Sequence, residues 1–126
     1  MCVVVAAVVA YTCCAQDSRA QQVPDSAFSP HVSRPTFSVG AGPVIAVDAA
    51  HHNVHTIDGQ FMGFARLAAA DGYRVRSMSS ALSASALEDI DLLVIASPRH
   101  PETLRSRRRP IQVAYADREV AALRNW

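Results

Sequence analysis

The sequence predicts an α/β fold in which helices cover both faces of a parallel β-sheet. Two short runs, Val44–Val47 and Leu92–Ala96, contain only apolar residues, which is typical of strands buried on both faces. A third run, Tyr73–Met78, alternates apolar with polar side chains, as an edge strand does. Helical segments separate the three runs. Repeated strand–helix units of this length predict parallel strands joined by right-handed crossovers.

The composition limits the protein to one domain at most. The chain has 126 residues, of which half are hydrophobic and 18% are charged, and this excludes an intrinsically disordered protein. The formal net charge is +1, so nucleic acid is not expected as a partner. All twelve basic residues are arginine, which we interpret as a bias of composition, not as an arginine-specific function.

The first fifteen residues are expected to be a signal peptide or a lipoprotein signal. Met1–Ala10 contains only apolar side chains but is too short for a permanent membrane span, and Cys13-Cys14-Ala15 supplies small residues before a cut at Gln16. The expected location is therefore periplasmic, extracellular or lipid-anchored, and the membrane is a partner only through a lipid on Cys13 or Cys14. A buried N-terminal strand is the alternative. The third cysteine, Cys2, also lies here, so the rest of the chain has no thiol.

A flexible linker is expected at residues 16–42. It contains Pro24, Pro30 and Pro35 among serine, glutamine and aspartate, without helical or alternating periodicity. The folded domain is expected to begin at Pro43 and to span residues 43–126. Its first strand, Val44–Val47, follows directly.

A helix is expected at Gln60–Asp71. Its larger apolar side chains recur every three residues and form one stripe: Phe61, Phe64 and Leu67. Asp58 is the expected N-cap, and Gly72 is the expected stop. A second, short helix is expected to begin at Ser83 or Ser85, since Ser85 and Glu88 have the spacing of a capping box.

The end of the sequence predicts an incomplete sheet. Residues 97–113, which include the run Arg105–Arg109, have the composition of an exposed loop, and a helix follows from Asp117 with Val120 and Leu123 on one face. A fourth strand would be expected next. We therefore expect a flavodoxin-like three-layer sandwich with strand order 2-1-3 and three helices, truncated within its domain, in which the third strand keeps a bare apolar edge.

The candidate site is the loop that follows the first strand. Ligands of parallel sheets bind at the carboxyl ends of the strands, where this loop and the residue after the third strand are expected to meet. The candidate ligand-binding residues are Asp48, His51, His52, Asn53, His55, Thr56 and Ser97. The neighbouring Arg107-Arg108-Arg109 is interpreted as part of a solvated loop.

Three interpretations of the histidines remain open. His51, His52 and His55 are weak candidates for binding zinc with Asp48, because their spacing is not that of two ligands on one helical face. They can instead hydrogen-bond the loop backbone and fix its shape. One of them can also act as a catalytic base. No other cofactor is expected.

A resemblance to a known family follows from the order of several short motifs. The first motif consists of Val47, Asp48, His51, Asn53, His55 and Thr56, followed by Asp58-Gly59-Gln60-Phe61. The later motifs are Asp71-Gly72-Tyr73-x-Val75, Leu87-x-x-Ile90-Asp91-Leu92-Leu93-Val94-Ile95-Ala96 and Glu119-Val120-x-Ala122-Leu123-x-x-Trp126. Together they resemble the N-terminal part of a bacterial family of unknown function in the class I glutamine amidotransferase-like superfamily. That family is similar to the domain of gliding-motility ABC-transporter auxiliary proteins, so the resemblance implies membrane transporter components as partners.

The sequence departs from the family pattern in three ways. Ala49 stands where an acidic residue is common, and Ala114-Tyr115 stands where a small polar residue and phenylalanine usually precede the last helix. The Gly-Gly turn, strand and Asp-His pair that usually follow are absent from this sequence. The resemblance therefore supports the fold more than a reaction.

Two functions follow as hypotheses. The first is an exported, non-catalytic, amidotransferase-like binding module associated with an envelope transporter. It is preferred because the mature chain would have no cysteine nucleophile, and Ala96-Ser97-Pro98 is not the Gly-x-Ser-x-Gly elbow of a serine hydrolase. The alternative is a hydrolase-like enzyme that uses Asp48 and the loop with His51, His52 and His55.

Overall fold

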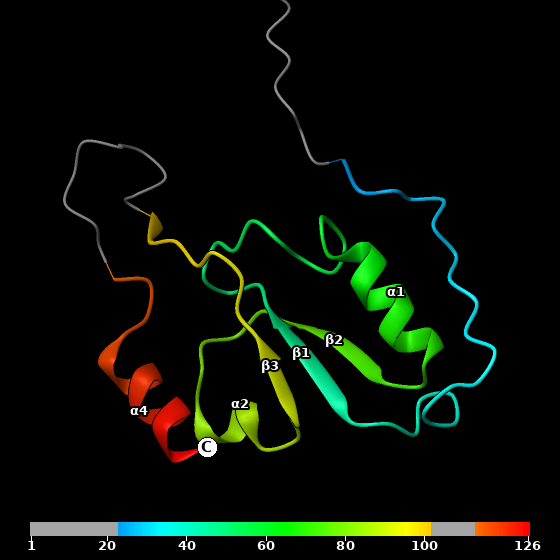
Figure 1. Cartoon of the computed structure of the whole chain (residues 1–126). Coiled ribbons are helices and arrows are strands. Elements are labelled where there is room, and N and C mark those ends of the chain that lie inside the picture. The colour runs from blue at the N-terminus through cyan, green and yellow to red at the C-terminus, as the bar shows by residue number, and fades with distance from the viewer. Residues whose placement is uncertain (1–22, 102–112) are drawn as a thin grey trace, which may run out of the picture.

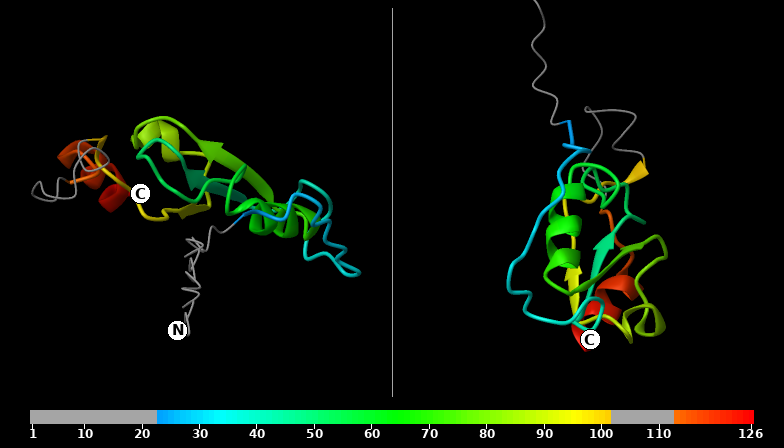
Figure 2. Two further views of the ribbon diagram at one scale, coloured as in Figure 1. Left: turned by 90° about the horizontal axis from the view of Figure 1, so that it is seen from above. Right: turned by 90° about the vertical axis from the view of Figure 1, so that its right-hand side faces the viewer.

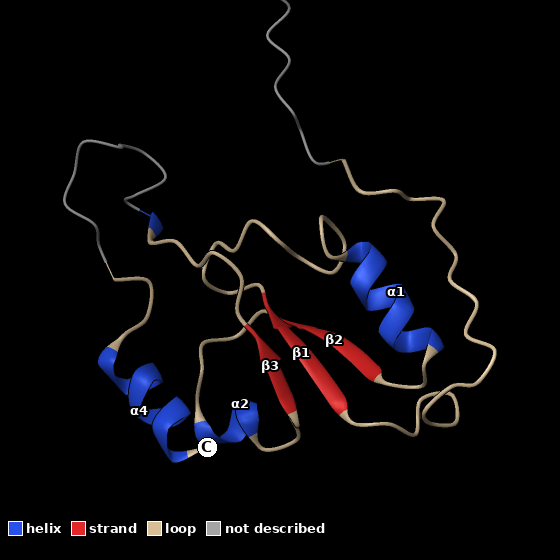
Figure 3. Ribbon diagram, in the orientation of Figure 1, coloured by secondary structure: helices blue, strands red, loops and turns tan. Residues whose placement is uncertain are grey.

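The computed structural model describes residues 23–101 and 113–126 and confirms the predicted α/β fold (Figures 1 and 3). One sheet contains three parallel strands in the order β2-β1-β3. They are β1 (Val44–Asp48), β2 (Arg74–Met78) and β3 (Leu92–Val94). The predicted order 2-1-3 is therefore correct.

The strand register brings the carboxyl ends of the strands together. Asp48 lies opposite Met78 in β2, and Val47 lies opposite Val94 in β3. The loops that follow β1 and β3 consequently leave the sheet side by side. This is the edge at which parallel sheets bind ligands.

The two apolar runs differ in burial because of their positions in the sheet. The central strand β1 is buried along its whole length, as predicted. In β3, Leu92 is 48% exposed, and Ile95, just after the strand, is 39% exposed. The prediction that the Leu92–Ala96 run is buried on both faces is wrong, because α1, which covers one face of the sheet, contacts β2 and not β3. The expected bare edge is observed, since in the described residues β3 pairs with β1 only.

The helices form layers on both faces of the sheet (Figure 2). One face carries α1 (Met62–Ala70), and the other carries α2 (Ala84–Leu87) and α4 (Asp117–Asn125). The hydrophobic core lies between the sheet and the α2–α4 layer. Its buried members are Val44, Ala46, Met78, Leu82, Leu87 and Ile90.

The α1 layer packs less tightly, and its start differs from the prediction. None of its residues is buried, and Leu67 is 49% exposed. The expected cap at Asp58 is wrong: the N-cap is Phe61, without a side-chain cap hydrogen bond. The reason is a turn before the helix, in which the carbonyl oxygen of Thr56 accepts hydrogen bonds from the backbone N–H groups of Gly59 and Phe61.

The helix stop at Gly72 is confirmed. Gly72 has φ +95°, a left-handed conformation that disfavours side chains, and a Cβ there would overlap the carbonyl oxygen of Phe37. Residues 23–42 contain no helix or strand, but part of this segment lies against α1 and β2. Thr36 hydrogen-bonds Asp71, and the rings of Phe37 and Tyr73 pack edge to face with centroids 5.1 Å apart.

The predicted short helix is present as α2, and its N-cap can be assigned. The short helix α2 begins after Ser83, whose hydroxyl accepts a hydrogen bond from the backbone N–H of Ala86. Ser83, not Ser85, is therefore the cap.

The predicted signal in Met1–Ala15 and the run Arg105–Arg109 lie outside the described residues. Within the described ranges, no helix has the length and apolar character needed to cross a membrane.

Candidate functional site

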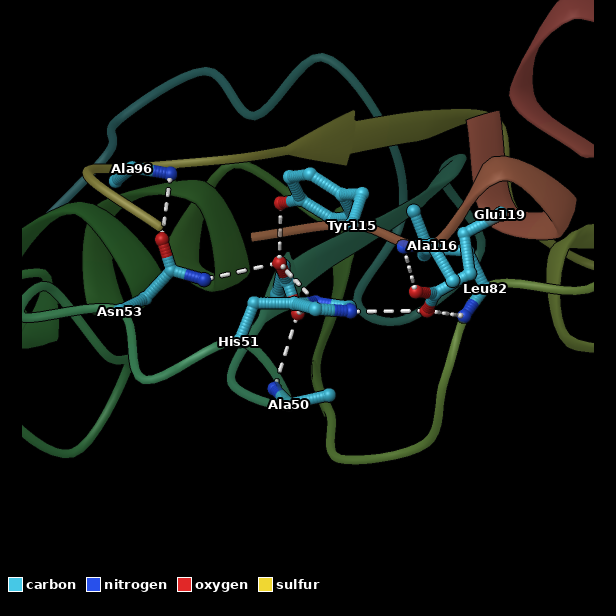
Figure 4. Close-up of polar contacts among 9 residues, drawn as sticks. Ala50, His51, Asn53, Leu82, Ala96, Tyr115, Ala116 and Glu119 are labelled. Carbon is cyan, nitrogen blue, oxygen red and sulfur yellow. Dashed lines mark hydrogen bonds and ion pairs between the residues drawn. The ribbon is translucent and has the colours of Figure 1, made fainter. Parts of the chain in front are cut away.

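Asp48, the last residue of β1, is the centre of a buried polar network. Figure 4 labels the residues around it, among them His51, Asn53 and Tyr115. Its carboxylate is fully buried. It accepts hydrogen bonds from the backbone N–H of Ala50 at 3.0 Å, the side-chain amide of Asn53 at 2.9 Å and the hydroxyl of Tyr115 at 2.7 Å. The ring Nδ1 of His51 lies 2.8 Å from the same carboxylate. A buried carboxylate needs such donors, because its desolvation is otherwise very costly.

His51 lies between two carboxylates. Its Nδ1 faces Asp48, and its Nε2 lies 2.9 Å from Oε1 of Glu119. The side chain is only 8% exposed. Ionised carboxylates only accept hydrogen bonds, whereas a neutral imidazole donates from one nitrogen only. The two contacts therefore engage both ring nitrogens of His51 with carboxylate oxygens.

Glu119 supplies the contact from the opposite side of the network. It lies in the first turn of α4, where its Oε2 accepts a hydrogen bond from the backbone N–H of Ala116 at 2.8 Å. This is one half of a capping box, since alanine has no side-chain acceptor for the other half. Oε1 also accepts from the backbone N–H of Leu82 at 3.0 Å. Burial alone would raise the pKa of Glu119, but the donors of Ala116, Leu82 and His51 lower it below its ordinary value.

Tyr115 closes the network just before α4. Its ring lies against that of His51, with centroids 4.2 Å apart and planes tilted by 41°. Burial, the hydrogen bond to Asp48 and the negative charges of Asp48 and Glu119 raise the pKa of Tyr115 well above its usual range. The phenol therefore remains a proton donor to Asp48 at neutral pH.

Two hydrogen bonds tie the loop after β1 to the loop after β3. The side-chain oxygen of Asn53 accepts from the backbone N–H of Ala96 at 3.1 Å. The carbonyl oxygen of His51 accepts from the backbone N–H of Arg99 at 2.7 Å. Each loop also contains a non-glycine residue with left-handed backbone, His52 at φ 46° and Ser97 at φ 53°. Such strain persists only where the surrounding structure imposes it, and it is often found at functional sites.

The structure brings together only part of the predicted site. Asp48, His51 and Asn53 share one buried network, whereas His52 and Ser97 are exposed. The ring of His55 stacks on Phe61 at 5.1 Å, and its buried Nδ1 has no hydrogen-bond partner within the described residues. Thr56 shapes the turn before α1 through its carbonyl oxygen.

The three histidines do not form a common set of metal ligands. Both ring nitrogens of His51 are hydrogen-bonded to carboxylates, while His52 is exposed and His55 stacks on a phenylalanine ring. In residues 23–101 and 113–126, no group of three or more histidine, cysteine, aspartate or glutamate side chains is placed to hold a metal ion.

The sequence-based site lacked Tyr115 and Glu119. Tyr115 precedes the last helix and contacts Asp48, which lies 67 residues earlier in the sequence. Glu119 lies in the first turn of that helix and contacts His51, 68 residues earlier. The one local indication for Glu119 is its position three residues after Ala116, where a glutamate can cap the start of a helix. No local pattern indicates that the same side chain reaches His51.

A hollow of about 390 Å³ lies beside the network. It is lined by buried His51 and Glu119 and half-buried Tyr115, and the exposed lining residues His52 and Arg99 form what we call its rim. It is situated at the carboxyl end of β1, as expected for a ligand crevice in a parallel sheet.

A second hollow, of about 500 Å³, lies at the opposite, amino end of the strands. Two arginines of β2, Arg74 and Arg76, line it together with Glu88, Asp89 and Asp91. Acidic and basic side chains occur together there, and Asp91 is engaged with the backbone N–H of Val44. We therefore take the crevice at the carboxyl end as the candidate site.

The fold and this crevice define the class of the protein as a small α/β protein with a flavodoxin-like parallel sheet. Comparisons with protein-family models, curated proteins and solved structures found no match to this chain. The resemblance to the amidotransferase-like family accordingly stays a prediction.

Proposed function

We propose that the protein is a non-catalytic binding module that takes a ligand in the crevice at the carboxyl ends of β1 and β3. The observation that carries this proposal is the engagement of both ring nitrogens of His51 by the carboxylates of Asp48 and Glu119. A histidine whose two ring nitrogens are both hydrogen-bonded stabilises the shape of the crevice. It has no free nitrogen with which to take a proton from a substrate.

The carboxylates and the hydroxyl near the crevice support the same conclusion. Asp48 is buried beneath His51 and Tyr115, and its carboxylate is hydrogen-bonded to four groups of the protein. It is therefore not accessible as a base. Ser97 is exposed on a left-handed backbone, and no histidine or carboxylate hydrogen-bonds it within the described part of the chain. A serine nucleophile needs such a base.

The expected setting of the module comes from the sequence. The apolar Met1–Ala15 segment favours export, and the motif resemblance favours an amidotransferase-like module that associates with an envelope transporter. Cell fractionation of the full chain tests export. Recovery of the uncleaved chain from the cytoplasm alone would contradict this part of the proposal and leave the binding module intact.

A ligand screen followed by nuclear magnetic resonance tests the binding function. The full chain is titrated with a small-molecule panel that contains neutral, cationic and anionic compounds. Binding in the crevice is expected to shift the amide resonances of residues 49–56 and 96–100. His52→Ala should weaken these shifts, whereas His31→Ala, at an exposed histidine in the segment before β1, should not. A panel that leaves both loops unperturbed would overturn the proposal.

One observation favours the alternative, a hydrolase-like enzyme. Asp48 contacts Nδ1 of His51 at 2.8 Å, the relationship by which an aspartate orients a catalytic histidine. This function requires Glu119 to leave Nε2. Hydrolysis of an activated ester by the full chain, lost in His51→Gln and enhanced in Glu119→Gln, would favour the enzyme. Equal rates in all three proteins would exclude it.

A further inference from the structure

We propose that the hollow beside the histidine network binds a small organic anion through the guanidinium of Arg99 and the imidazole of His52. This inference rests on the proposed binding function and names the chemical class of its ligand. It follows from which charges the crevice leaves available to a ligand.

The carboxylate acceptors of the crevice are already engaged by donors of the protein. Glu119 is buried and accepts hydrogen bonds from Leu82, Ala116 and His51. Asp48 is equally buried and fully hydrogen-bonded. Neither carboxylate therefore offers an acceptor to a ligand in the hollow.

The basic groups at the rim remain available. Arg99 is exposed, and its guanidinium makes no hydrogen bond or ion pair with any described residue. His52 is exposed at the same rim. The hydrogen-bonding capacity that the two side chains add is mainly that of donors, which fits carboxylate or phosphate oxygens.

Backbone hydrogen bonding fixes the positions of Arg99 and His52 in the two loops. The backbone N–H of Arg99 donates to the carbonyl oxygen of His51 at 2.7 Å. Because His51 is the residue before His52, this hydrogen bond fixes the loop after β3 next to His52. The left-handed backbone of His52 and Ser97 occurs on both sides of this hydrogen bond. A strained conformation in each of two neighbouring loops is the arrangement expected where the fold positions groups for binding.

The size of the hollow limits the ligand. A volume of about 390 Å³ lies in the range of small-molecule sites. The planar guanidinium can hold two oxygens of one carboxylate or phosphate group. The expected ligand is therefore a small organic molecule with at least one such oxyanion.

Calorimetric titration of the full chain tests this inference with matched probes. Succinate supplies carboxylates, inorganic phosphate supplies the other oxyanion, and succinamide is a neutral molecule of similar shape to succinate. We expect succinate or phosphate to bind and succinamide not to bind. Arg99→Gln should weaken binding at least about tenfold, as loss of a charge-assisted hydrogen bond does. Arg34→Gln, at an exposed arginine before β1, is the matched control and should leave binding unchanged.

A second variant separates binding from folding. His52→Gly removes the imidazole but suits the left-handed backbone at φ 46°. It should therefore keep or raise the melting temperature while it weakens anion binding. Resonance shifts of residues 49–56 and 96–100 on addition of succinate or phosphate would locate the site.

The outcomes distinguish this inference from the proposed function. If only neutral or cationic panel members shift the crevice resonances, the anion proposal is overturned and the binding module stands. If no ligand shifts them, both fail. Equal weakening by Arg34→Gln and Arg99→Gln would mean that the anion responds to overall charge, and it would also overturn the proposed site.

Discussion

Glu119 of α4 accepts a hydrogen bond from His51 of the loop after β1, at 2.9 Å and across 68 residues of sequence. This contact joins the last helix to the carboxyl end of the central strand. Since Glu119 also accepts from the backbone of Leu82 and Ala116, one side chain connects three segments of the protein. The stability of the crevice should therefore depend strongly on it.

Glu119→Gln is expected to destabilise the protein. Loss of the negative charge leaves His51 facing only one carboxylate, and removing one partner of a buried charged contact costs about 3 kcal/mol. Urea unfolding measures the change in the free energy of unfolding. Glu88→Gln, at an exposed glutamate after α2, is the control and should change stability by less than about 0.5 kcal/mol. Equal effects of the two substitutions would contradict the structural role of Glu119.

Acid should weaken the protein through the same carboxylate. The pKa of Glu119 lies below its ordinary value of 4.5 in the folded state. Its charge therefore contributes stability fully above about pH 4.5, and this contribution is lost as the pH falls through the lowered pKa. Unfolding measured from neutral pH down to acid should show a decline in stability that is shallower in Glu119→Gln. An identical pH dependence in both proteins would disprove this linkage.

Tyr115 should ionise only at unusually high pH. Its raised pKa, caused by burial and then by the hydrogen bond and charge of Asp48, favours the folded state below the ordinary value of 10.0. That contribution is lost as the pH rises further. An ultraviolet titration of phenolate should show a late step that Tyr115→Phe removes, and Tyr73→Phe is the control. Removal of the hydroxyl should cost about 1 to 2 kcal/mol, because its partner is a charged group.

Gly72→Ala should be more destabilising than Gly40→Ala. Both glycines have left-handed backbone, at φ +95° and +70°, so both substitutions introduce backbone strain of about 1 kcal/mol. Only at Gly72 would the new Cβ overlap the carbonyl oxygen of Phe37, whereas no atom lies within 4 Å at Gly40. We expect Gly72→Ala to cost at least about 1 kcal/mol more. Thermal unfolding of the two variants side by side tests this difference.

Local patterns in the sequence predicted the sheet well. The apolar run of β1 and the alternation of β2 reflect how many faces of each strand are covered, and the order of elements then determines the parallel topology. The predicted burial of β3 was wrong because an apolar run does not indicate that α1 packs on β2 and leaves one face of β3 uncovered. The cap at Asp58 was wrong because the turn formed by Thr56 delays the start of α1.

The candidate site was predicted in its position but only partly in its chemistry. Asp48, His51 and Asn53 follow β1 directly, so the end of the strand indicated them. Which histidine turns inward depends on the backbone at His52, whose left-handed conformation separates two adjacent side chains. Glu119 was missed because its contact with His51 exists only after α4 has packed against the core.

The link between His51 and Glu119 also has a consequence for the order of folding. The pairing of β1 with β2 and the packing of α1 join segments that are near in sequence, whereas the His51–Glu119 contact closes a loop of 68 residues. Closing such a loop costs on the order of 4 kcal/mol of chain entropy. Other contacts must offset this cost before the His51–Glu119 contact can stabilise the chain. The part of the crevice lined by His51 and Glu119 should therefore form last, on a sheet that has already assembled.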